Sequence, residues 1–192
     1  MVQRPADAEL VRRCRQGERS AVEELLGRYE KYIYCLCRSV LGRHEDALDA
    51  TQEVLLKVFE HLCTFDVTRP LTPWVHRIAL NTALSELHRR RPELSLEDEL
   101  TRLGQEPAAS TNVEREVEER EGLQHLRREL AALPPLQRAV FFLRHFEDLS
   151  YEDISATCAL PLGTVKTYLF RGRRQLKEKV GAFFAGGADS EV

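Results

Sequence analysis

Apolar residues recur every three or four positions along most of this chain, which is the spacing of an amphipathic helix. No segment alternates between apolar and polar side chains with the period of two that is typical of a β-strand. The pattern predicts helices over residues 7–17, 20–42, 45–62, 72–91, 114–133, 135–146, 151–158 and 162–180. The chain is therefore expected to be an all-α protein.

Residues with the chemistry of helix caps stand at several of these boundaries. The expected N-caps are Asp7, Ser20, Thr72 and Ser150, and the expected glycines at helix ends are Gly17 and Gly42. Glu23 and Asp153 each lie three residues after a capping serine, which is the spacing of a capping box.

The stretch between residues 92 and 113 interrupts the helical pattern. It holds two prolines, a glycine and a Ser-Thr-Asn cluster. Residues 92–121 carry 3 Lys and Arg against 10 Asp and Glu, whereas the whole chain carries 28 against 31, a net charge of only −3. We expect two small helical domains, 1–91 and 114–184, joined by an acidic flexible linker over 92–113 and followed by a disordered tail over 185–192.

Composition excludes several classes of protein. Of the 192 residues, 43% are hydrophobic and 31% are charged, which is enough apolar material for a core. The longest apolar run, Ala139 to Leu143, is far too short to cross a bilayer, and the N-terminus does not resemble a secretory signal. The odd number of cysteines, 5, without a regular spacing favours a reducing, cytoplasmic compartment.

No metal site and no catalytic site is expected. Cys35 and Cys37 stand two positions apart on a predicted helix and therefore point away from each other, and His61 and Cys63 share this spacing. The sequence has no phosphate-binding glycine loop, no nucleophile elbow and no carboxylate cluster with catalytic geometry. We therefore expect no cofactor and no enzymatic activity of the chain's own.

The strongest chemical signal lies near the C-terminus. A short helix over 151–158, a tight turn at 159–161 and a longer helix over 162–180 form the helix-turn-helix pattern of DNA-binding proteins. One face of the longer helix is apolar and is expected to pack through Val165, Leu169, Leu176 and Val180. The opposite face carries cations, a hydroxyl and an aromatic ring: Lys166, Thr167, Phe170, Arg171, Arg173 and Arg174. Such a face suits phosphates and base edges.

The helix over 45–62 has a narrow acidic stripe formed by Asp46, Asp49, Glu53 and Glu60, with Lys57 beside them. Its expected core face comprises Val54, Leu55, Val58, Phe59 and Leu62. An acidic stripe is usually no more than a solvated face, so this helix alone does not predict a partner.

The helix over 72–91 is basic at its C-terminal end, where cations also favour the helix macrodipole. Arg77 and Asn81 share one ridge of this helix, and Trp74 is expected in the core. A basic helix in each domain suggests two contacts with one polyanion.

Three segments together resemble sigma factors of the extracytoplasmic-function (ECF) group of bacterial RNA polymerase, the small members that have only conserved regions 2 and 4. Residues 45–62, EDALDATQEVLLKVFEHL, are similar to the core-binding part of region 2, including the Gln52-Glu53 pair. Residues 73–91, PWVHRIALNTALSELHRRR, are similar to the part that melts the promoter and reads the minus-ten element. Residues 133–155 and 161–176 resemble region 4 with its minus-thirty-five-reading helix.

The resemblance implies a partner for each face. Core polymerase would bind Asp46, Asp49, Gln52 and Glu53 through the clamp helices of its largest subunit, and the flap of the second largest subunit would be a further contact. Minus-ten DNA would contact Trp74, Arg77, Asn81, Arg89 and Arg90, with a flipped base held by the loop over 65–72. Minus-thirty-five DNA would contact Lys166, Thr167, Phe170, Arg171, Arg173 and Arg174. The acidic linker would run toward the RNA exit path. An anti-sigma factor would be a regulatory partner, and no membrane insertion is implied.

Two positions depart from the family pattern. His76 stands where the family often has Tyr, and Ala159 stands where the turn usually has Gly. If the backbone at Ala159 is left-handed, Ala costs about 1 kcal/mol relative to Gly; otherwise the turn is built differently.

Two other functions stay open at this point. The first is a helix-turn-helix regulator that binds operators without polymerase, and the acidic stripe with Gln52-Glu53 argues against it. The second is a helical adaptor with no nucleic-acid role, and the basic face over 162–180 argues against that.

Overall fold

The computed structural model describes residues 5–90 and 125–187, with side chains for residues 7–90 and 125–179. All regular structure in these ranges is helical, which confirms the all-α expectation. The first range contains α1 (Pro5–Arg15), α2 (Arg19–Leu41), α3 (His44–His61), the 3₁₀ turn η1 (Leu62–Thr64) and α4 (Leu71–Arg90). The second contains a helix over 125–131, α7 (Pro135–His145), α8 (Tyr151–Cys158) and α9 (Leu162–Gly187).

Two parts of the expected organisation fall outside these ranges. The expected linker over 92–113 lies outside the described residues, as do residues 188–192 of the expected tail. α9 continues to Gly187, past residue 184, where the C-terminal domain was expected to end.

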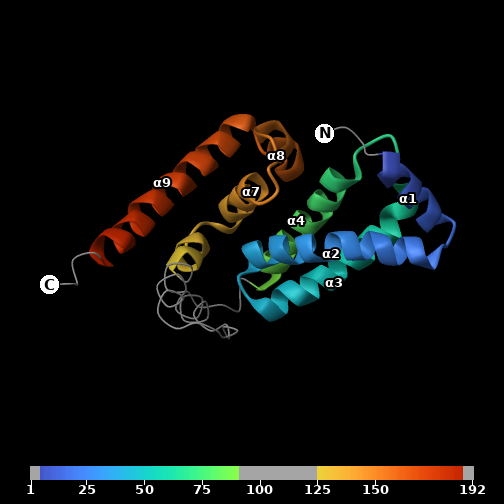
Figure 1. Cartoon of the computed structure of the whole chain (residues 1–192), viewed down its shortest axis with the longest axis horizontal. Helices are drawn as coiled ribbons and strands as arrows, with labels where there is room; N and C mark the ends of the chain where they lie inside the picture. Colours follow the sequence, from blue (N-terminus) through green and yellow to red (C-terminus); the bar gives the residue numbers. More distant parts are fainter. Residues whose placement is uncertain (1–4, 91–124, 188–192) are drawn as a thin grey trace.

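The first four helices form one packed unit. α2 and α3 run side by side and α4 packs against both, while α1 packs on α2 (Figure 1). The buried positions of α2 include Leu25, Tyr29, Ile33 and Leu36, which recur at helical spacing. This spacing places one continuous apolar stripe of α2 against its neighbours, as the sequence pattern predicts.

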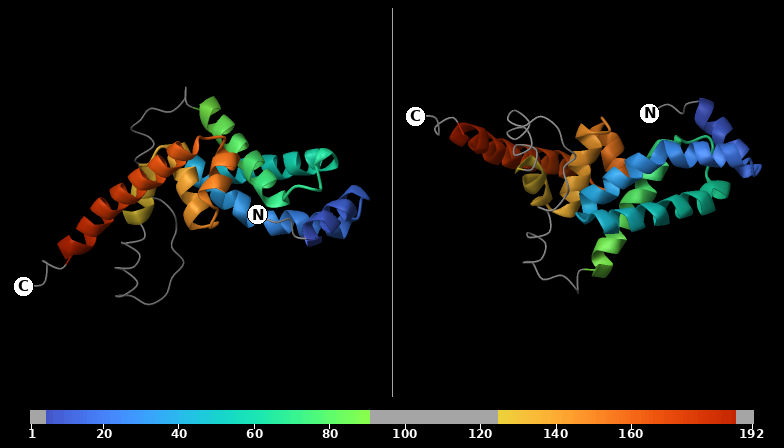
Figure 2. Two further views of the ribbon diagram at one scale, coloured as in Figure 1. Left: turned by 90° about the horizontal axis from the view of Figure 1, so that it is seen from above. Right: turned by 60° about the horizontal axis from the view of Figure 1, so that its bottom comes forward.

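The second unit packs directly on the first. α7 lies against α2 and α8 lies against α4, and the buried side chains of both units form one continuous core. α9 packs on α7 and α8 (Figures 1 and 2). Further along α9, Lys179 forms an ion pair with Glu129 of the helix over 125–131 at 2.9 Å. The two units expected as domains are therefore in contact in this structure.

Aromatic and polar side chains mark the contact between the units. The Tyr32 ring of α2 stacks on His76 of α4 with ring centroids 4.2 Å apart, and it lies 6.1 Å from the Phe142 ring of α7. The Tyr32 hydroxyl, both His76 ring nitrogens and the Thr157 hydroxyl are buried and have no hydrogen-bond partner within the described ranges. Burial lowers the pKa of His76 to about 4 and raises that of Cys158 to about 12, so both groups are neutral near pH 7.

Helix capping agrees with the sequence prediction at some ends and not at others. Ser150 caps α8, because its Oγ accepts a hydrogen bond from the Asp153 backbone N–H at 3.0 Å. Gly42 follows α2 in a left-handed conformation (φ 80°), and its N–H donates to the Arg38 carbonyl. Gly17 has the same φ just after α1. These three predictions are confirmed.

The other three predicted N-caps are wrong. Asp7 lies inside the first turn of α1 and pairs with Arg28 at 2.6 Å. Ser20 lies inside α2, whose N-cap position is Glu18. Thr72 lies inside α4, and its hydroxyl is 3.0 Å from the hydroxyl of Tyr29. Asp7 and Thr72 instead interact with side chains of α2, Arg28 and Tyr29. Spacing along the sequence does not predict such contacts between helices.

The turn between α8 and α9 has a left-handed residue that is not glycine. Ala159 adopts φ 52° and ψ 41° at the C-cap of α8, and its N–H donates to the Ser155 carbonyl. The left-handed alternative at this position is therefore the correct one. An L-residue with a Cβ pays steric energy in this conformation, which Gly does not.

We expect Ala159→Gly to raise the free energy of unfolding by about 1 kcal/mol, because it removes this strain. The matched control is Ala156→Gly, since Ala156 is also exposed but lies inside α8. There, Gly is expected to lower the free energy of unfolding by about 0.5–1 kcal/mol. Urea denaturation followed by circular dichroism measures both changes. Destabilisation by both glycines would show that the turn carries no strain.

Candidate polymerase and nucleic-acid interfaces

α3 presents a face that is both acidic and apolar. Its buried side comprises small and medium residues: Ala47, Ala50, Thr51, Val54 and Val58. On the opposite side, Asp49, Gln52, Glu53 and Glu60 are exposed. The same side exposes Leu48, Leu56 and Phe59, with exposed fractions of 42%, 62% and 51%. We call these seven residues the α3 outer face.

The predicted core face of this helix is partly wrong. Phe59 was expected in the core and is exposed, and Leu55 is only half-buried. The buried side of the helix is centred on its small residues because α3 packs against both α2 and α4. Ala47 and Ala50, which are 0% and 2% exposed, allow the neighbouring helices to approach, and larger apolar side chains remain outside.

Asp46 was expected on the exposed stripe and is instead buried. It is 5% exposed and forms an ion pair with Arg90 at the end of α4. Arg90 also pairs with Glu86, which is 6% exposed and pairs with Arg89 in addition. The hydrogen bonds and positive charge of the two arginines offset burial and hold the pKa of Glu86 below its usual value. The structure thus joins Asp46 and Arg90, which had been assigned to polymerase and DNA separately.

The remaining predicted minus-ten residues lie along α4 in different environments. Asn81 and Arg89 are exposed, although Arg89 is engaged by Glu86. Trp74 is half-buried and packs on Phe65, with ring centroids 4.8 Å apart. Arg77 is exposed along part of its side chain and donates a hydrogen bond to the Ala156 carbonyl of α8.

Hydrogen bonds hold the loop over 65–72, which was predicted to bind a flipped base. Asp66 accepts hydrogen bonds from the backbone N–H of Thr68 at 2.9 Å and from its hydroxyl at 2.7 Å. These two bonds lower the pKa of Asp66. Arg15 of α1 donates to the carbonyls of Leu62 and Phe65, which ties the start of the loop to the first helix.

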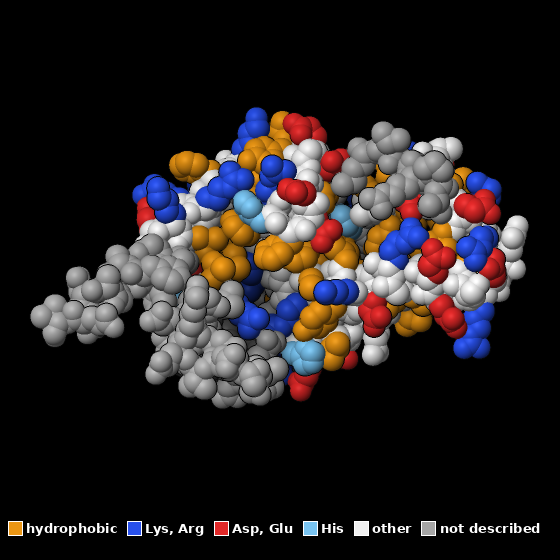
Figure 3. Space-filling model, viewed as in Figure 1, with side chains coloured by type: hydrophobic (Ala, Val, Ile, Leu, Met, Phe, Trp, Pro, Cys, Tyr) orange, Lys and Arg blue, Asp and Glu red, His pale blue; other side chains and the backbone are white. Residues whose placement is uncertain are grey.

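α8 and α9 have the helix-turn-helix geometry that the sequence predicts. Val165, Leu169 and Leu176 are buried, as expected, whereas the side chain of Val180 lies outside the described residues. The opposite side of α9 exposes all the residues expected there: Lys166, Thr167, Phe170, Arg171, Arg173 and Arg174. Lys and Arg side chains are visible over α9 in Figure 3. We call these six residues the α9 basic face.

The residues of the α9 basic face differ in how they are held. Arg174 pairs with Glu178 at 2.8 Å, and Arg173 donates to the His145 ring nitrogen at 3.4 Å. Lys166 and Arg171 have no ion pair within the described part of the chain. Burial and the neighbouring arginines lower the pKa of His145, which keeps its ring a hydrogen-bond acceptor for Arg173 at neutral pH.

Within residues 5–90 and 125–187, no three His, Cys, Asp or Glu side chains form a group that could hold a metal ion. Cys37 is buried, which raises its thiol pKa to about 12, while Cys35 is half-buried. Across residues 5–90 and 125–187, no helix is both long and apolar enough to cross a membrane.

Comparison with known proteins follows the same division of the chain. The family model for Sigma-70 region 2 matches residues 25–93, and the model for Sigma-70, region 4 matches residues 123–176. The ECF RNA polymerase sigma-E factor of Escherichia coli (strain K12) is 31% identical over 186 residues, which cover 94% of this chain and 97% of that protein. This chain belongs to the ECF family of RNA polymerase sigma factors.

Other relatives agree with this assignment. The ECF RNA polymerase sigma factor SigW of Bacillus subtilis (strain 168) is 28% identical over 176 residues, covering 88% of this chain and 94% of SigW. Among solved structures, the sigma factor RpoE from Bartonella quintana, crystallised with the anti-sigma factor NepR, matches with a TM-score of 0.65 and 24% identity, covering 83% of this chain and 96% of RpoE. CnrH in complex with the cytosolic domain of CnrY matches with a TM-score of 0.63 and 22% identity, covering 96% of this chain and 99% of CnrH.

Sequence reasoning missed the apolar half of the α3 outer face in this sigma factor. Leu48 and Leu56 were assigned no role, and Phe59 was assigned to the core. The available signal was the presence of Ala47 and Ala50 on one side of the helix, where a close contact with neighbouring helices could form. The positions of the large apolar residues alone therefore predicted a buried side of α3 that wrongly included Phe59.

Proposed function

We propose that this sigma factor docks on core RNA polymerase through the α3 outer face and reads promoter DNA through α4 and the α9 basic face. In this proposal residues 1–91 act as region 2, 92–113 as a linker and 114–184 as region 4. The chain contributes no catalytic activity of its own and acts in the bacterial cytoplasm, where polymerase and promoters are found.

The observation that carries the proposal is the pair of chemically different exposed faces on one chain. A helix-turn-helix regulator that works alone needs a basic recognition face, but it has no use for exposed leucines beside carboxylates on another helix. Leu56 and Phe59 are more than half exposed within the described structure, and Asp49 and Glu53 flank them on α3. Such a mixed face is suited to a protein partner with apolar and basic groups.

The proposal divides the predicted core-binding residues by their burial. Asp49, Gln52 and Glu53 would contact the clamp helices directly, because they are exposed. Asp46 would not contact polymerase and would have a structural role, in which its ion pair with Arg90 holds the end of α4 against α3. The flap of the second largest subunit remains the proposed contact of region 4.

Asn81 is the proposed base-reading residue of α4, because it is exposed and its amide can both donate to and accept from a base edge. We expect Asn81→Ala to reduce open-complex formation more than duplex-promoter binding. Permanganate reactivity of thymines near the start site reports melting at saturating holoenzyme. Ser85→Ala is the control, since Ser85 is exposed one turn further along α4. Normal melting in Asn81→Ala would assign Asn81 a purely structural role.

We also propose that an anti-sigma factor regulates this protein. Among the solved structures with the same fold, RpoE was determined with the anti-sigma factor NepR, and CnrH was determined with the cytosolic domain of CnrY. The proposed DNA-reading residue Arg77 is bound by the Ala156 carbonyl of α8 in the present arrangement. Contact between Arg77 and DNA would therefore require this hydrogen bond to break.

Run-off transcription tests the proposed function. The purified chain, core polymerase and a genomic fragment library should together give discrete transcripts that neither protein gives alone. Gel-shift titration of the selected promoters with the chain alone should show much weaker duplex binding than holoenzyme. Equally tight binding by the chain without polymerase would instead support the stand-alone regulator.

A further inference from the structure

Arg15, the last residue of α1, is bonded to the segment that leads from α3 into α4. Its Nε donates to the Leu62 carbonyl at 3.0 Å, and its Nη2 donates to the Phe65 carbonyl. These two bonds cross 47 and 50 positions of the chain, and α1 also packs against η1 (Figure 1). α1 lies before residues 25–93, which match the region 2 model, and neither of the interfaces proposed above includes Arg15.

The helix macrodipole does not explain where this side chain points. A cation in the last turn of α1 is favourable in any direction, and Arg12 and Arg13 lie in the same turn. Each of those two arginines pairs with a glutamate. Arg15 has no carboxylate partner within the described part of the chain and donates to two backbone carbonyls instead. Its guanidinium therefore holds the start of the loop.

Phe65 is the residue at which the chain leaves η1 and enters the loop. Its backbone is extended, with φ −64° and ψ 130°, and the direction of its carbonyl sets the plane of the peptide bond to Asp66. Arg15 holds that carbonyl, while Trp74 packs on the buried Phe65 ring, with ring centroids 4.8 Å apart. Contacts on both the main chain and the side chain of Phe65 therefore fix the direction in which the loop begins.

Beyond Phe65 the loop forms a turn that has its own hydrogen bonds. The Asp66 side chain accepts from the Thr68 N–H at 2.9 Å, and the Asp66 carbonyl accepts from the Arg69 N–H at 3.0 Å. Because these bonds lie within the turn, they fix its shape, whereas contacts at its ends fix its orientation. A change in the direction of the Phe65 carbonyl would therefore reorient the turn as one piece.

We propose that Arg15 is a positioning residue for promoter melting, and that it orients the loop over 65–72 to receive a flipped base of the minus-ten element. This inference rests on the proposed function, because it requires region 2 to read promoter DNA with that loop. A binding site recognises its ligand well only when its groups are held to within about 0.5 Å of the correct geometry. Arg15 would supply that precision from outside the site, through two carbonyls and without touching DNA.

Arg15 suits this role because both bonds come from one rigid group. Nε and Nη2 belong to the same planar guanidinium, so their fixed spacing also fixes the spacing of the Leu62 and Phe65 carbonyls. A lysine ammonium has the same charge but no such fork. The proposal therefore predicts that Arg15→Lys retains much less base discrimination than the wild type, although its charge is unchanged.

An abasic nucleotide in the non-template strand tests this role directly. A scan of abasic sites through the minus-ten element, with wild-type holoenzyme and single-stranded oligonucleotides, identifies the position where loss of the base weakens binding most. Arg15→Met, which removes every donor, is then compared with wild type on the intact strand and on that abasic strand. We expect Arg15→Met to weaken binding about tenfold on the intact strand and by less than about twofold on the abasic strand. The abasic strand has no base for the loop to position.

The two strands distinguish positioning from general structural support. An equal loss of affinity on both strands, or no loss on either, would overturn the proposal, and so would wild-type discrimination by Arg15→Lys. If wild-type holoenzyme shows no sensitivity to any abasic site, the base-holding loop is wrong and this inference fails with it. Run-off transcription tests the proposed function separately, because promoter-specific transcripts can form without a base pocket in this loop.

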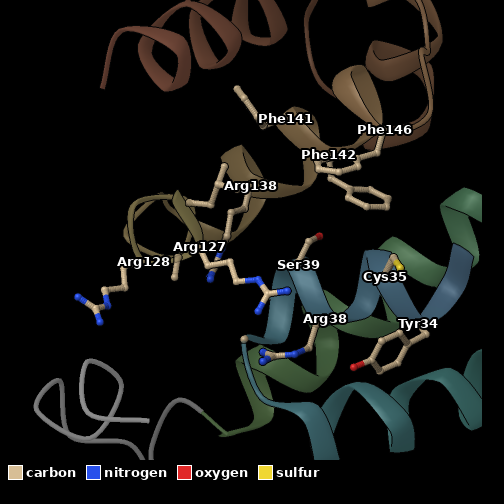
Figure 4. Close-up of a pocket in the computed structure, with 13 residues that line it drawn as sticks. Tyr34, Cys35, Arg38, Ser39, Arg127, Arg128, Arg138, Phe141, Phe142 and Phe146 are labelled. Carbon is tan, nitrogen blue, oxygen red and sulfur yellow. The ribbon is translucent and has the colours of Figure 1, made fainter. Parts of the chain in front are cut away.

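Two matched variants remove the same charge elsewhere. Arg12→Met changes another exposed arginine of α1, whose partner is Glu9. Arg128→Met changes an exposed arginine of the helix over 125–131, which lines the cavity between that helix, α2 and α7 (Figure 4). Both variants should keep the wild-type ratio of affinities for the intact and abasic strands. A changed ratio in either variant would attribute the effect to net charge and overturn the proposal.

Hydrogen exchange and core binding provide readouts that do not involve DNA. Arg15→Met should speed amide exchange over residues 62–69, and it should leave exchange in α2 and α3 and the affinity for core polymerase unchanged. Arg15 is exposed, so its replacement leaves no cavity in the core. Faster exchange throughout region 2, or weaker core binding, would show that Arg15 supports the fold as a whole and would overturn the proposal.

Discussion

Replacing both Asp49 and Glu53 with Lys is expected to weaken binding to core RNA polymerase by up to about 2 kcal/mol, or roughly thirtyfold. Both carboxylates lie on the α3 outer face and are exposed. Asp49 has no ion pair among the described residues, and Glu53 pairs only with Lys57, one turn away, at 2.6 Å. An exposed pair contributes about 0.2–1 kcal/mol, so the double variant is needed for a clear effect.

The helix itself should survive this double reversal, because neither residue contacts the core and one i,i+4 pair stabilises a helix by only about 0.3–0.5 kcal/mol. The matched control is the double reversal of Glu9 and Glu23, which are exposed on α1 and α2. Competition against a labelled wild-type chain for core polymerase measures the affinities. An unchanged affinity of the α3 variant would remove the proposed role of its carboxylates.

The apolar part of the same face can be tested separately. Leu56→Ser should also weaken core binding, because Leu56 is 62% exposed in the described structure and its burial at an interface is worth about 1.5–3 kcal/mol. The substitution removes little packing within the sigma factor. Equal loss of affinity and of folded stability would show that Leu56 supports the helix instead.

Arg171→Ala on α9 is expected to cost about 1–3 kcal/mol of promoter binding, roughly 5- to 150-fold, and to relax the preference at one position of the minus-thirty-five element. Arg171 is exposed on the side of α9 opposite to the buried Val165 and Leu169. Its side chain makes no ion pair within the described ranges, so its fork can read a guanine without first breaking a contact.

The same substitution distinguishes base reading from phosphate binding. If Arg171 only holds a phosphate, affinity should fall evenly across sequences, and the dependence of log affinity on log salt should decrease by about one unit. We expect that second behaviour for Arg173 and Arg174, which lie later on α9 and are engaged by His145 and Glu178. Holoenzyme binding to a set of single-base promoter variants at several salt concentrations measures both.

Leu169→Glu is the folding control for the α9 variants. Leu169 is 1% exposed, and a charge at that position has no partner to offset its burial, so region 4 should unfold. Arg171→Ala should remain fully helical by circular dichroism. Normal transcription from a minus-thirty-five-dependent promoter by folded Arg171→Ala would show that another face of α9 enters the groove.

The amino-acid sequence by itself determined the helices and the two faces of α9. These features depend on contacts within one helical turn or on a cap such as Ser150, whose partner Asp153 is three residues away. The family assignment was also accessible from sequence, because its motifs are short and continuous. The left-handed turn at Ala159 was one of two alternatives, and only the backbone conformation decided between them.

Tertiary structure alone decided which side of α3 is buried, and it placed Asp46 against Arg90 across 44 positions of the chain. The periodicity of the sequence shows where the large apolar residues of a helix lie. Which side is buried depends instead on how closely the neighbouring helices approach, and the small side chains of Ala47 and Ala50 allow a close approach. Tertiary structure also brought α2 and α7 together, and Arg138 of α7 donates a hydrogen bond to the Val40 carbonyl of α2 at 3.3 Å. No spacing within either segment predicts that contact, because it joins residues 98 positions apart in the chain.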